Sequence, residues 1–504
     1  MHSAEPAPER SSPHGAQAGA QAGARAGAQA GARGGPPPDL PRTLGELRSA
    51  GWRSVPIADE LRRNAAERIA AGRPVVEGVL GFDETVVPQL ENALLAGHDV
   101  ILLGERGQAK TRILRALVTL LDEWMPVVAG SEINDDPLHP ISRFARLRVA
   151  DEGDDTPVDW VHRSDRYGEK LATPDTSIAD LIGEVDPIKV AEGRYLSDEL
   201  TLHYGLVPRV NRGIFAINEL PDLAERIQVG LLNVLEERDV QIRGHRVRLP
   251  LDVVLVATAN PEDYTNRGRI ITPLKDRFGA QIRTHYPRDV ATEVAVVRAE
   301  ARIPSDGVPV TVPEHLEEVV AEVSQLARRN PHLNQRSGVS VRLSIANFET
   351  LVASARRRAL RTGEPEAVPR VSDLAALVSS TQGKVEVEAL EEGREEEVFA
   401  QLVATAVLAV FRRRVVLADP AGVVADFDAG KVVHTGDDLP AAQYLAALRE
   451  VPGLEAPARA LAGGEGESPG MLAAAVELVL EGLHLTKRLN KDASGSRAVY
   501  RSRH

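Results

Sequence analysis

The segment GERGQAKT at residues 104–111 constrains this chain more than any other part of its sequence. It follows the apolar run DVILL and precedes TRILRALVTLL, which has the spacing of an amphipathic helix. A glycine-rich turn between a strand and a helix turns backbone N–H groups toward a phosphate, and the helix start adds a favourable dipole. The segment predicts a phosphate-binding loop in an α/β fold. Considered alone, an ordinary glycine-rich turn is the alternative.

The loop residues have distinct expected roles. Lys110 would reach the β- and γ-phosphates of a nucleotide, and the Thr111 hydroxyl would bind Mg²⁺. Glycine is usual before the lysine, but Ala109 stands there, so we expect the loop to form only if Ala109 keeps a negative φ. The residues expected to surround the phosphates are Gly104, Glu105, Arg106, Gly107, Gln108, Ala109, Lys110 and Thr111.

A second segment, RGIFAINEL at residues 212–220, carries four apolar residues into Asn218 and Glu219. ATPases of this fold class end such a strand in two acidic groups, the first for Mg²⁺ and the second for the attacking water. Glu219 suits the second role. Asn218 can accept a hydrogen bond from metal-bound water but brings no charge, which we expect to cost roughly 10- to 100-fold in metal affinity or activity. A buried strand with an incidental polar end is the alternative.

Two more segments complete the set. LVATAN, at residues 255–260, delivers Asn260 to the C-terminal edge of a sheet, where an amide can sense the γ-phosphate. ITPLKDRF, at residues 271–278, contains Arg277, which suits an arginine finger offered to a neighbouring subunit and worth about 10³ to 10⁵ in rate. Taken alone, Arg277 would be read as a surface or salt-bridged arginine. Four such segments in this order predict nucleotide binding and hydrolysis.

Composition excludes several other classes of protein. The chain has no cysteine, which removes disulfides, thiolate metal sites and cysteine nucleophiles. A net charge of -13 argues against broad nucleic-acid or membrane-surface binding. The longest mainly apolar run, residues 399–411, is too short to span a bilayer, and the N-terminus lacks a signal-peptide core. A cytoplasmic location is the resulting expectation.

Changes in pattern along the chain predict five parts. Residues 1–41 are an Ala/Gly/Gln/Arg-rich tail that we expect to be disordered, and residues 42–74 read as helical. Residues 75–288 alternate apolar runs with helical patterns, which is typical of a parallel sheet with crossover helices. We expect residues 289–385 to form a helical lid and residues 386–504 a helical C-terminal extension.

Within the last two parts, helices are expected at about residues 340–361 and 472–489. The charge run at residues 386–397 reads as a solvated face. The basic C-terminal end, from residue 487, reads as frayed.

From about Val75 to Arg361 the sequence resembles the magnesium chelatase ATPase-subunit and MoxR branch of the AAA+ superfamily. The resemblance is carried by GERGQAKT, by GLVPRVNRGIFAINELPDLAERIQVGLLNVLEERDVQIRG at residues 205–244, and by NRGRIITPLKDRFG at residues 266–279. It implies a three-layer αβα P-loop core with a parallel sheet, an all-α lid and a C-terminal extension. It also implies ATP and Mg²⁺ as cofactors. Alanine before the loop lysine is familiar in that branch.

The resemblance carries further implications. The lid of such proteins places a second sensor arginine near a helix start, for which Arg342 is the best match and Arg336 the second. It implies a ring, commonly a hexamer, with ATP between subunits and Arg277 acting across the interface. It also implies a hairpin inserted in helix 2, expected at residues 178–196. A separate protein with a von Willebrand A domain is a possible partner.

The resulting prediction is an ATP-hydrolysing ring that remodels a client or partner protein. One alternative is the motor subunit of a magnesium or cobalt chelatase. Another, favoured by Asn218, is an ATP-gated scaffold with little hydrolysis. A transcription activator would carry a GAFTGA loop, which this sequence lacks, and the acidic net charge also argues against DNA binding.

Overall fold

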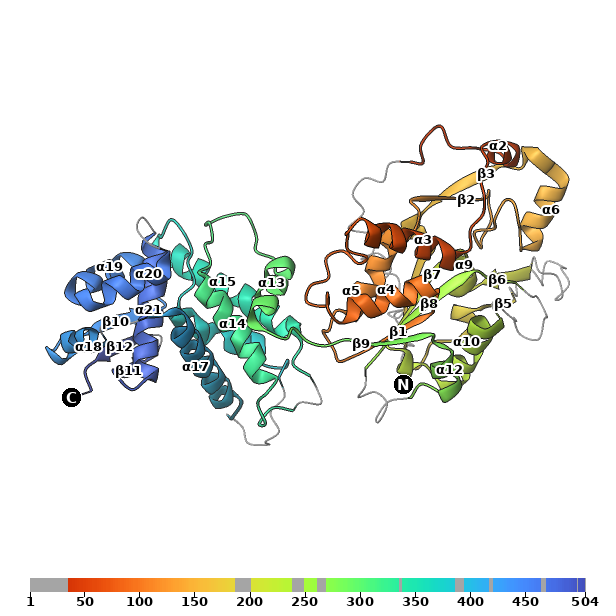
Figure 1. Ribbon diagram of the computed structural model, residues 1–504. Coiled ribbons are helices and arrows are strands. Elements are labelled where there is room, and N and C mark those ends of the chain that lie inside the picture. The colour runs from red at the N-terminus through yellow and green to blue at the C-terminus, as the bar shows by residue number, and fades with distance from the viewer. Residues whose placement is uncertain are drawn as a thin grey trace, which may run out of the picture.

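The computed structural model describes residues 35–185, 201–237, 249–260, 269–334, 338–385, 394–416, 420–463, 468–495 and 497–503. These residues form two lobes joined by the segment that follows strand β9 (Ala280–Arg283), as Figure 1 shows. The first lobe contains the described residues up to β9, and the second contains the later helices and a small sheet. The predicted order of an α/β unit followed by a mainly helical one is confirmed.

A five-stranded sheet lies at the centre of the first lobe, with strand order β4-β7-β8-β1-β9 and parallel pairing throughout. The apolar runs predicted as strands fall within β1, β7 and β8. Because parallel strands end at one edge, the segments after these three strands come together there. The remaining bounds are Val100–Leu103 (β1), Tyr167–Leu171 (β4), Gly213–Asn218 (β7) and Val253–Ala259 (β8).

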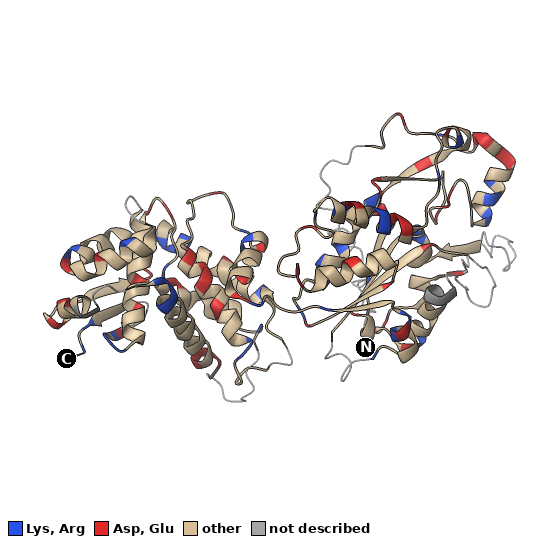
Figure 2. Ribbon diagram, in the orientation of Figure 1, with Lys and Arg blue, Asp and Glu red and all other residues tan. Residues whose placement is uncertain are grey.

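Helices cover both faces of this sheet, because its strands are apolar on both sides and must be shielded from water. Val100 and Leu102 of β1 pack with one group of helices, and Ile101 packs with the other. In Figure 2 the strands of the sheet are mostly tan, and the red and blue segments that mark charged residues lie mainly on the helices. The three-layer αβα core is thereby confirmed.

The bounds of these two helical layers are as follows. The first face is covered by α3 (Ile57–Ala70), α4 (Val86–Ala96), α5 (Lys110–Ala116) and η1 (Leu117–Leu120). The second face is covered by α7 (Ile178–Leu181), α9 (Leu206–Arg209), η5 (Leu220–Asp222), α10 (Glu225–Glu237) and α12 (Thr272–Arg277).

An antiparallel arm that the sequence did not predict lies between η1 and β4. Its strands pair from Val128↔Val158 to Trp124↔His162, and helix α2 of the N-terminal segment joins it through a bridge between Thr43 and Pro157. The predicted helical segment at residues 42–74 therefore packs on this lobe. The elements are α2 (Leu44–Ser49), β2 (Trp124–Val128), α6 (Arg143–Glu152), η2 (Gly153–Asp155), β3 (Val158–His162) and η3 (Arg163–Arg166).

The predicted helix-2 insert begins with α7 and continues into β5 (Gly183–Val185). This strand pairs antiparallel with β6 (Leu202–Tyr204), as the two arms of a hairpin would. Most of the predicted insert, residues 186–196, lies outside the described residues.

The lid helices form the part of the second lobe next to the core. Helix α15 begins at the predicted position, where the Ser340 hydroxyl accepts a hydrogen bond from the backbone N–H of Arg342 at 3.1 Å. It ends at Gly363, whose φ of 71° is readily adopted only by glycine. The lid elements are α13 (Val290–Glu300), α14 (Glu314–Ala327), α15 (Val341–Thr362), η7 (Val371–Leu377) and α16 (Val378–Thr381).

The C-terminal extension is mainly helical, as predicted, and it shares a core with the lid. Phe348 and Leu351 of the lid belong to one buried cluster with Phe399 and Val407 of α17. The predicted boundary at residue 385 therefore passes through a common core. The helices are α17 (Arg394–Arg414), α18 (Pro420–Asp428), α19 (Ala441–Glu450), η8 (Pro452–Leu454), α20 (Glu455–Ala462) and α21 (Pro469–Leu485).

The expectation of a frayed C-terminal end is wrong. Strands β11 (Asn490–Ser494) and β12 (Arg497–Arg501) pair antiparallel, and β12 also pairs with β10 (Val433–Gly436). The order of this sheet is β10-β12-β11. Ala498 and Tyr500 are buried, whereas the alternate basic residues face outward, so the basic composition concealed a half-buried strand.

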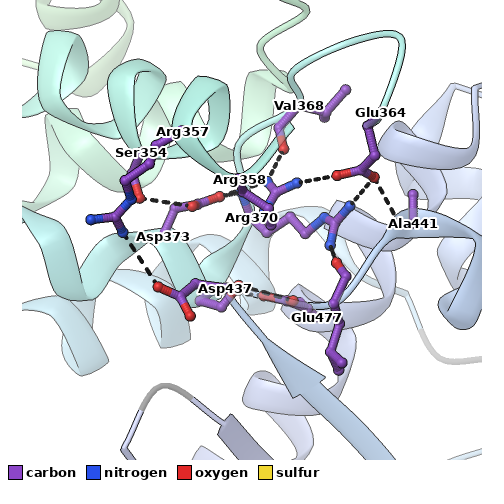
Figure 3. A network of polar contacts seen from close by, with 12 residues as sticks. Ser354, Arg357, Arg358, Glu364, Val368, Arg370, Asp373, Asp437, Ala441 and Glu477 are labelled. Atoms are coloured by element: carbon purple, nitrogen blue, oxygen red, sulfur yellow. Dashed lines mark hydrogen bonds and ion pairs between the residues drawn. The ribbon is translucent and has the colours of Figure 1, made fainter. Parts of the chain in front are cut away.

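A buried network of charges joins the lid to the extension (Figure 3). Arg358 contacts Asp373 at 2.8 Å, and Arg370 contacts Glu364 at 2.9 Å. The Arg370 guanidinium also donates to the backbone carbonyl of Leu439 at 2.7 Å. Because a buried charge is tolerated only when it is paired, these contacts hold the two parts in one arrangement.

Two smaller expectations can also be compared with the fold. Glu395, Glu396 and Glu397 of the predicted charge run are exposed at the start of α17, and residues 386–393 lie outside the described part. Among the described residues, no helix is both long and apolar enough to cross a membrane.

Candidate functional site

The predicted phosphate loop connects β1 to α5 at the C-terminal edge of the sheet. Its glycines are needed because the backbone is crowded there. A Cβ atom on Gly104 would lie 2.0 Å from the Thr284 hydroxyl oxygen, and one on Gly107 would lie 1.9 Å from the Ser340 hydroxyl oxygen. The Gln108 side-chain oxygen accepts hydrogen bonds from the Glu105 backbone at 3.1 Å and from Thr284 at 2.8 Å. These contacts fix the shape of the loop.

Ala109 corrects one expectation. The loop was expected to need a negative φ at this residue, but Ala109 has a φ of 56° and a ψ of 13°. The left-handed conformation is the one that glycine would supply at this position. The loop therefore forms with its usual backbone, and the alanine methyl group makes it strained by about 1–2 kcal/mol.

Lys110 lies at the centre of the site. Its side chain is nearly buried and donates to the backbone carbonyls of Gly104 and Glu105, the latter at 2.7 Å. It also donates to the side-chain oxygen of Asn260 at 2.7 Å. The sequence placed Lys110 and Asn260 in separate segments, and the sheet brings them into direct contact. A phosphate bound in this loop would contact the Lys110 ammonium group, which already points into the loop.

Thr111 and Asn218 form the second half of the site. The Thr111 hydroxyl donates to the Asn218 side-chain oxygen at 3.2 Å, and the Thr258 hydroxyl donates to the same oxygen at 3.3 Å. The backbone N–H of Glu219 donates to the Thr258 hydroxyl at 3.0 Å, and Glu219 has a φ of 57°. The half-buried Glu219 side chain thus begins from a fixed backbone beside Asn218.

Sequence reasoning missed Glu169, on strand β4. The Asn218 amide nitrogen donates to the Glu169 carboxylate at 2.6 Å. Arg115 of α5 also contacts this carboxylate, at 2.7 Å. The contact depends on the register between two strands about 50 residues apart in sequence, which periodicity does not reveal. The one signal in the sequence was Asn218 itself, because an amide at a position where a carboxylate is expected suggests that a neighbouring residue supplies the carboxylate.

The two candidate arginines lie away from this cluster. Arg277 is the last residue of α12, is exposed, and belongs to the helical layer opposite α5. Arg342 is exposed in the first turn of α15, two residues after Ser340, which lies against Gly107. The second sensor candidate, Arg336, lies outside the described residues.

The segment after β9 and the lid contact the loop and the helix that follows it. The Tyr286 hydroxyl donates to the Arg106 carbonyl at 2.9 Å, and Arg112 forms an ion pair with Glu300 of α13. Together with Ser340, these contacts place the start of α15 over the phosphate loop.

The residues present suit ATP and Mg²⁺. Mg²⁺ prefers oxygen ligands and is usually held by one or two protein groups together with phosphates and water. Thr111 and Asn218 offer a hydroxyl and an amide oxygen in contact with each other, and Glu219 follows Asn218 directly in the chain. Within the described part of the chain, no group of three or more His, Cys, Asp or Glu side chains could hold a metal ion.

Comparison with known proteins gives a consistent result. The family model described as "Sigma-54 interaction domain" matches residues 191–277. The chain is 31% identical over 210 residues to the magnesium-chelatase 38 kDa subunit of Cereibacter sphaeroides, which covers 39% of this chain and 54% of that protein. It is 28% identical over 243 residues to the magnesium-chelatase subunit ChlI of a Nostoc species, covering 46% and 60% of the two chains.

The chain contains an AAA+ domain. This AAA+ domain is related to magnesium-chelatase subunits, as the resemblance predicted. The chain spans little more than half the length of these relatives. The MoxR part of the resemblance is not tested by these matches.

Solved structures give a weaker comparison. A model of the complex between subunits BchI and BchD of magnesium chelatase matches with a TM-score of 0.34 and 23% identity, covering 65% of this chain and all of that one. NtrX from Brucella abortus in complex with ATP matches with a TM-score of 0.38 and 13% identity, covering 77% and 72%. Because both scores are low, the fold of the AAA+ domain rests here on its own strand order.

Proposed function

We propose that this chain is an ATP hydrolase that works as an AAA+ ring and remodels a client or partner protein. The observation that carries the proposal is the contact of Lys110 with Asn260 beside the contact of Thr111 with Asn218. Groups from three strand ends that sequence patterns assign to phosphate and metal lie within hydrogen-bond distance of one another. That arrangement is needed for phosphoryl transfer, in which positioning and charge supply most of the catalysis.

Each residue has a proposed role. Lys110 and the loop amides bind the phosphates, while Thr111 and Asn218 face Mg²⁺, which neutralises developing charge when bound. Glu219 orients the attacking water, and Asn260 senses the γ-phosphate. The exposed Arg277 enters the site of the neighbouring subunit, and Arg342 couples the lid to the nucleotide. These roles need a ring, for which a hexamer is the proposal by resemblance.

The partner and the location are further proposals. A separate protein with a von Willebrand A domain is the proposed partner, and a cytoplasmic location stays a prediction. The names of the chelatase relatives favour one alternative, in which the ring drives magnesium or cobalt insertion into a tetrapyrrole. A chelation assay with the purified chain and its partner would separate this alternative from general remodelling.

The proposal predicts that ATP turnover depends on two subunits at once. Glu219→Gln removes the proposed water-orienting carboxylate and should lower turnover about 10²- to 10⁴-fold. Arg277→Ala should lower it about 10³-fold or more, because the finger is lost. Arg361→Ala, at an exposed arginine in the last turn of α15, is the matched control and should leave turnover unchanged.

Mixing the two inactive variants gives the decisive measurement. A subunit with Arg277→Ala keeps an intact site, and a neighbour with Glu219→Gln keeps an intact finger. Turnover should therefore reappear when the two are mixed, and it should rise with protein concentration. Mixtures that stay inactive, while wild type is active at every concentration, would rule out an arginine acting between subunits.

A second candidate is an ATP-gated scaffold with little hydrolysis. It is favoured by Asn218, which brings no charge to the metal side of the site. In that case wild type would bind ATP but show no turnover above Glu219→Gln at any concentration, with or without its partner.

A further inference from the structure

Glu169 lies on the strand next to the one that carries Asn218. In the parallel register, Glu169 of β4 is opposite Ala216 of β7, and Leu171 is opposite Asn218. Because side chains alternate between the faces of a strand, Glu169 and Asn218 are diagonal neighbours on one face of the sheet. The strand pairing thus brings the Glu169 carboxylate next to Asn218, the position where a carboxylate was expected and an amide stands.

The contacts between the two side chains define how the amide is turned. The Asn218 nitrogen donates to Glu169 at 2.6 Å, while its oxygen accepts from the hydroxyls of Thr111 and Thr258. The opposite orientation would place the amide oxygen against a carboxylate and the NH₂ group toward Thr111. A hydrogen bond to a charged acceptor is roughly twice as strong as a neutral one, so the carboxylate decides the orientation.

Glu169 is itself held in place from its other side. Arg115 contacts both carboxylate oxygens, at 2.7 and 2.8 Å, and the Tyr167 hydroxyl donates to one of them at 3.2 Å. The Glu169 side chain is 21% exposed and Arg115 is 64% exposed, so the arginine charge is screened by solvent more than the carboxylate is. Glu169 can therefore still polarise the amide that it contacts.

We propose that Glu169 is a positioning residue for the metal side of the nucleotide site. It turns the Asn218 oxygen toward Thr111 and makes that oxygen a stronger acceptor for metal-bound water. The negative charge that this fold class keeps on the strand carrying Asn218 is thus supplied by the neighbouring strand. This inference rests on the proposed function, since it assumes that Mg²⁺ and ATP bind beside Thr111.

The proposal predicts that the effect of Glu169→Gln depends on residue 218. With Asn218 present, the loss of the carboxylate removes the charge and weakens the hold on the amide. With Asn218→Asp, the intact Glu169 would face a second carboxylate about 2.6 Å away, and like charges this close oppose each other. In the Asn218→Asp background, Glu169→Gln replaces the repulsion between the two carboxylates by a hydrogen bond from the new amide to Asp at residue 218. The negative charge of the site is then carried by residue 218 itself.

The experiment measures nucleotide affinity rather than activity. A fluorescent ATP analogue is titrated with and without MgCl₂ on wild type, Glu169→Gln, Asn218→Asp and the double variant, and thermal unfolding is followed for each. The readout is the gain in affinity on adding Mg²⁺. We expect Glu169→Gln to lower this gain about tenfold beside Asn218 and to leave it equal or higher beside Asp. Affinity without Mg²⁺ should stay within about twofold of wild type, since the lysine and loop contacts are untouched.

Controls separate positioning from general stability. Glu77→Gln makes the same change at an exposed glutamate paired with Arg68 and should leave the gain unchanged. If Glu169→Gln lowers the unfolding temperature, Glu169→Asp is used in its place. This variant keeps the negative charge on a shorter side chain that no longer reaches Asn218, and it should lower the gain in affinity by the same factor.

Two results would overturn the proposal. One is a gain that Glu169→Gln does not alter in the wild-type background. The other is an equal fall in both backgrounds, which would mean that Glu169 acts only on the structure. Failure of the proposed function looks different, because wild type would then either not bind the ATP analogue or bind it without turnover above Glu219→Gln. Neither result is read from the effect of Glu169→Gln on the gain in affinity.

Discussion

Ala109 is a strained residue of the phosphate loop. Its φ of 56° places a methyl group where glycine is normally found. We expect Ala109→Gly to stabilise the first lobe by about 0.5–1 kcal/mol, because relief of about 1–2 kcal/mol of strain exceeds the extra entropy of unfolding. Urea unfolding followed by tryptophan fluorescence measures this, since Trp52, Trp124 and Trp160 all lie in the first lobe.

A matched control for this prediction lies in the same helix. Ala116 ends α5 with an ordinary φ of -65°, so Ala116→Gly should destabilise the lobe by about 0.5–1 kcal/mol. Equal losses of stability in both variants would show that Ala109 is not strained.

At this scale the sequence predicted the residues that belong to short local patterns. Lys110, Thr111 and Asn260 follow apolar runs, and the sheet brings each of them into contact with a residue of another predicted segment, while their roles stay predictions. Glu169 could not be found in this way, because its role depends on which strand lies beside β7 and in what register.

Helix α14 contains a group whose protonation should make the second lobe sensitive to acid. His315 is almost fully buried, and this burial lowers its pKa to about 3. The unfolded chain takes up a proton below about pH 6.5, whereas the folded chain stays neutral down to about pH 3. Stability is therefore lost as the pH falls through this window, by up to about 1.4 kcal/mol per pH unit from this group.

Replacing His315 tests the origin of that loss. We expect His315→Leu to reduce the fall in unfolding temperature of the second lobe between pH 7 and pH 5, as measured by calorimetry. The Nε2 atom of His315 has no hydrogen-bond partner, whereas the ring hydrogen-bonds to the backbone of Ala474, so the comparison is made on the pH dependence and not on the stability at pH 7. An unchanged pH dependence would assign the acid sensitivity to other groups.

Elements were predicted well where one physical signal dominated. The strands β1, β7 and β8 are apolar runs, of which β1 leads into a glycine-rich loop and β7 and β8 lead into asparagines. Helix α15 begins at a serine and ends at a glycine. The β2–β3 arm and the C-terminal hairpin were missed, because each pairs strands whose partners are distant or mostly polar. In the hairpin, the alternating apolar residues Ala498 and Tyr500 indicate a strand with one buried face. The basic residues around them indicate a solvated chain end, and this second signal was the stronger one in the sequence.

The described residues form two lobes, in which the segment from residue 42 packs with the core and the lid packs with the C-terminal extension. The lid shares the buried cluster of Phe348 and Val407 with α17, and Arg370 reaches across to Leu439. We expect a chain truncated after residue 385 to lose the cooperative unfolding of the lid, since its core would be open and the buried Arg370 guanidinium would lose its contact with Leu439. Tryptophan-monitored unfolding of the first lobe should persist.

Calorimetry of the truncated chain beside the full chain checks this expectation. Truncation after residue 489, which removes only the C-terminal hairpin, is the milder comparison and should lower the transition of the second lobe without abolishing it. A lid that still unfolds cooperatively in residues 1–385 would mean that the lid is stable without the C-terminal extension.

The shared core also has a mechanical consequence. Helix α17 has 21 residues and is therefore about 30 Å long, and it is fixed to the lid helices along its packed face. A turn of the lid by about 10° around the single connection after β9 would carry a point at that distance through about 5 Å. The shared core joins the C-terminal extension, with its β10-β12-β11 sheet, to the lid as one body. This sheet would therefore be the far end of a lever, and the short arm of that lever is the start of α15 at the phosphate loop.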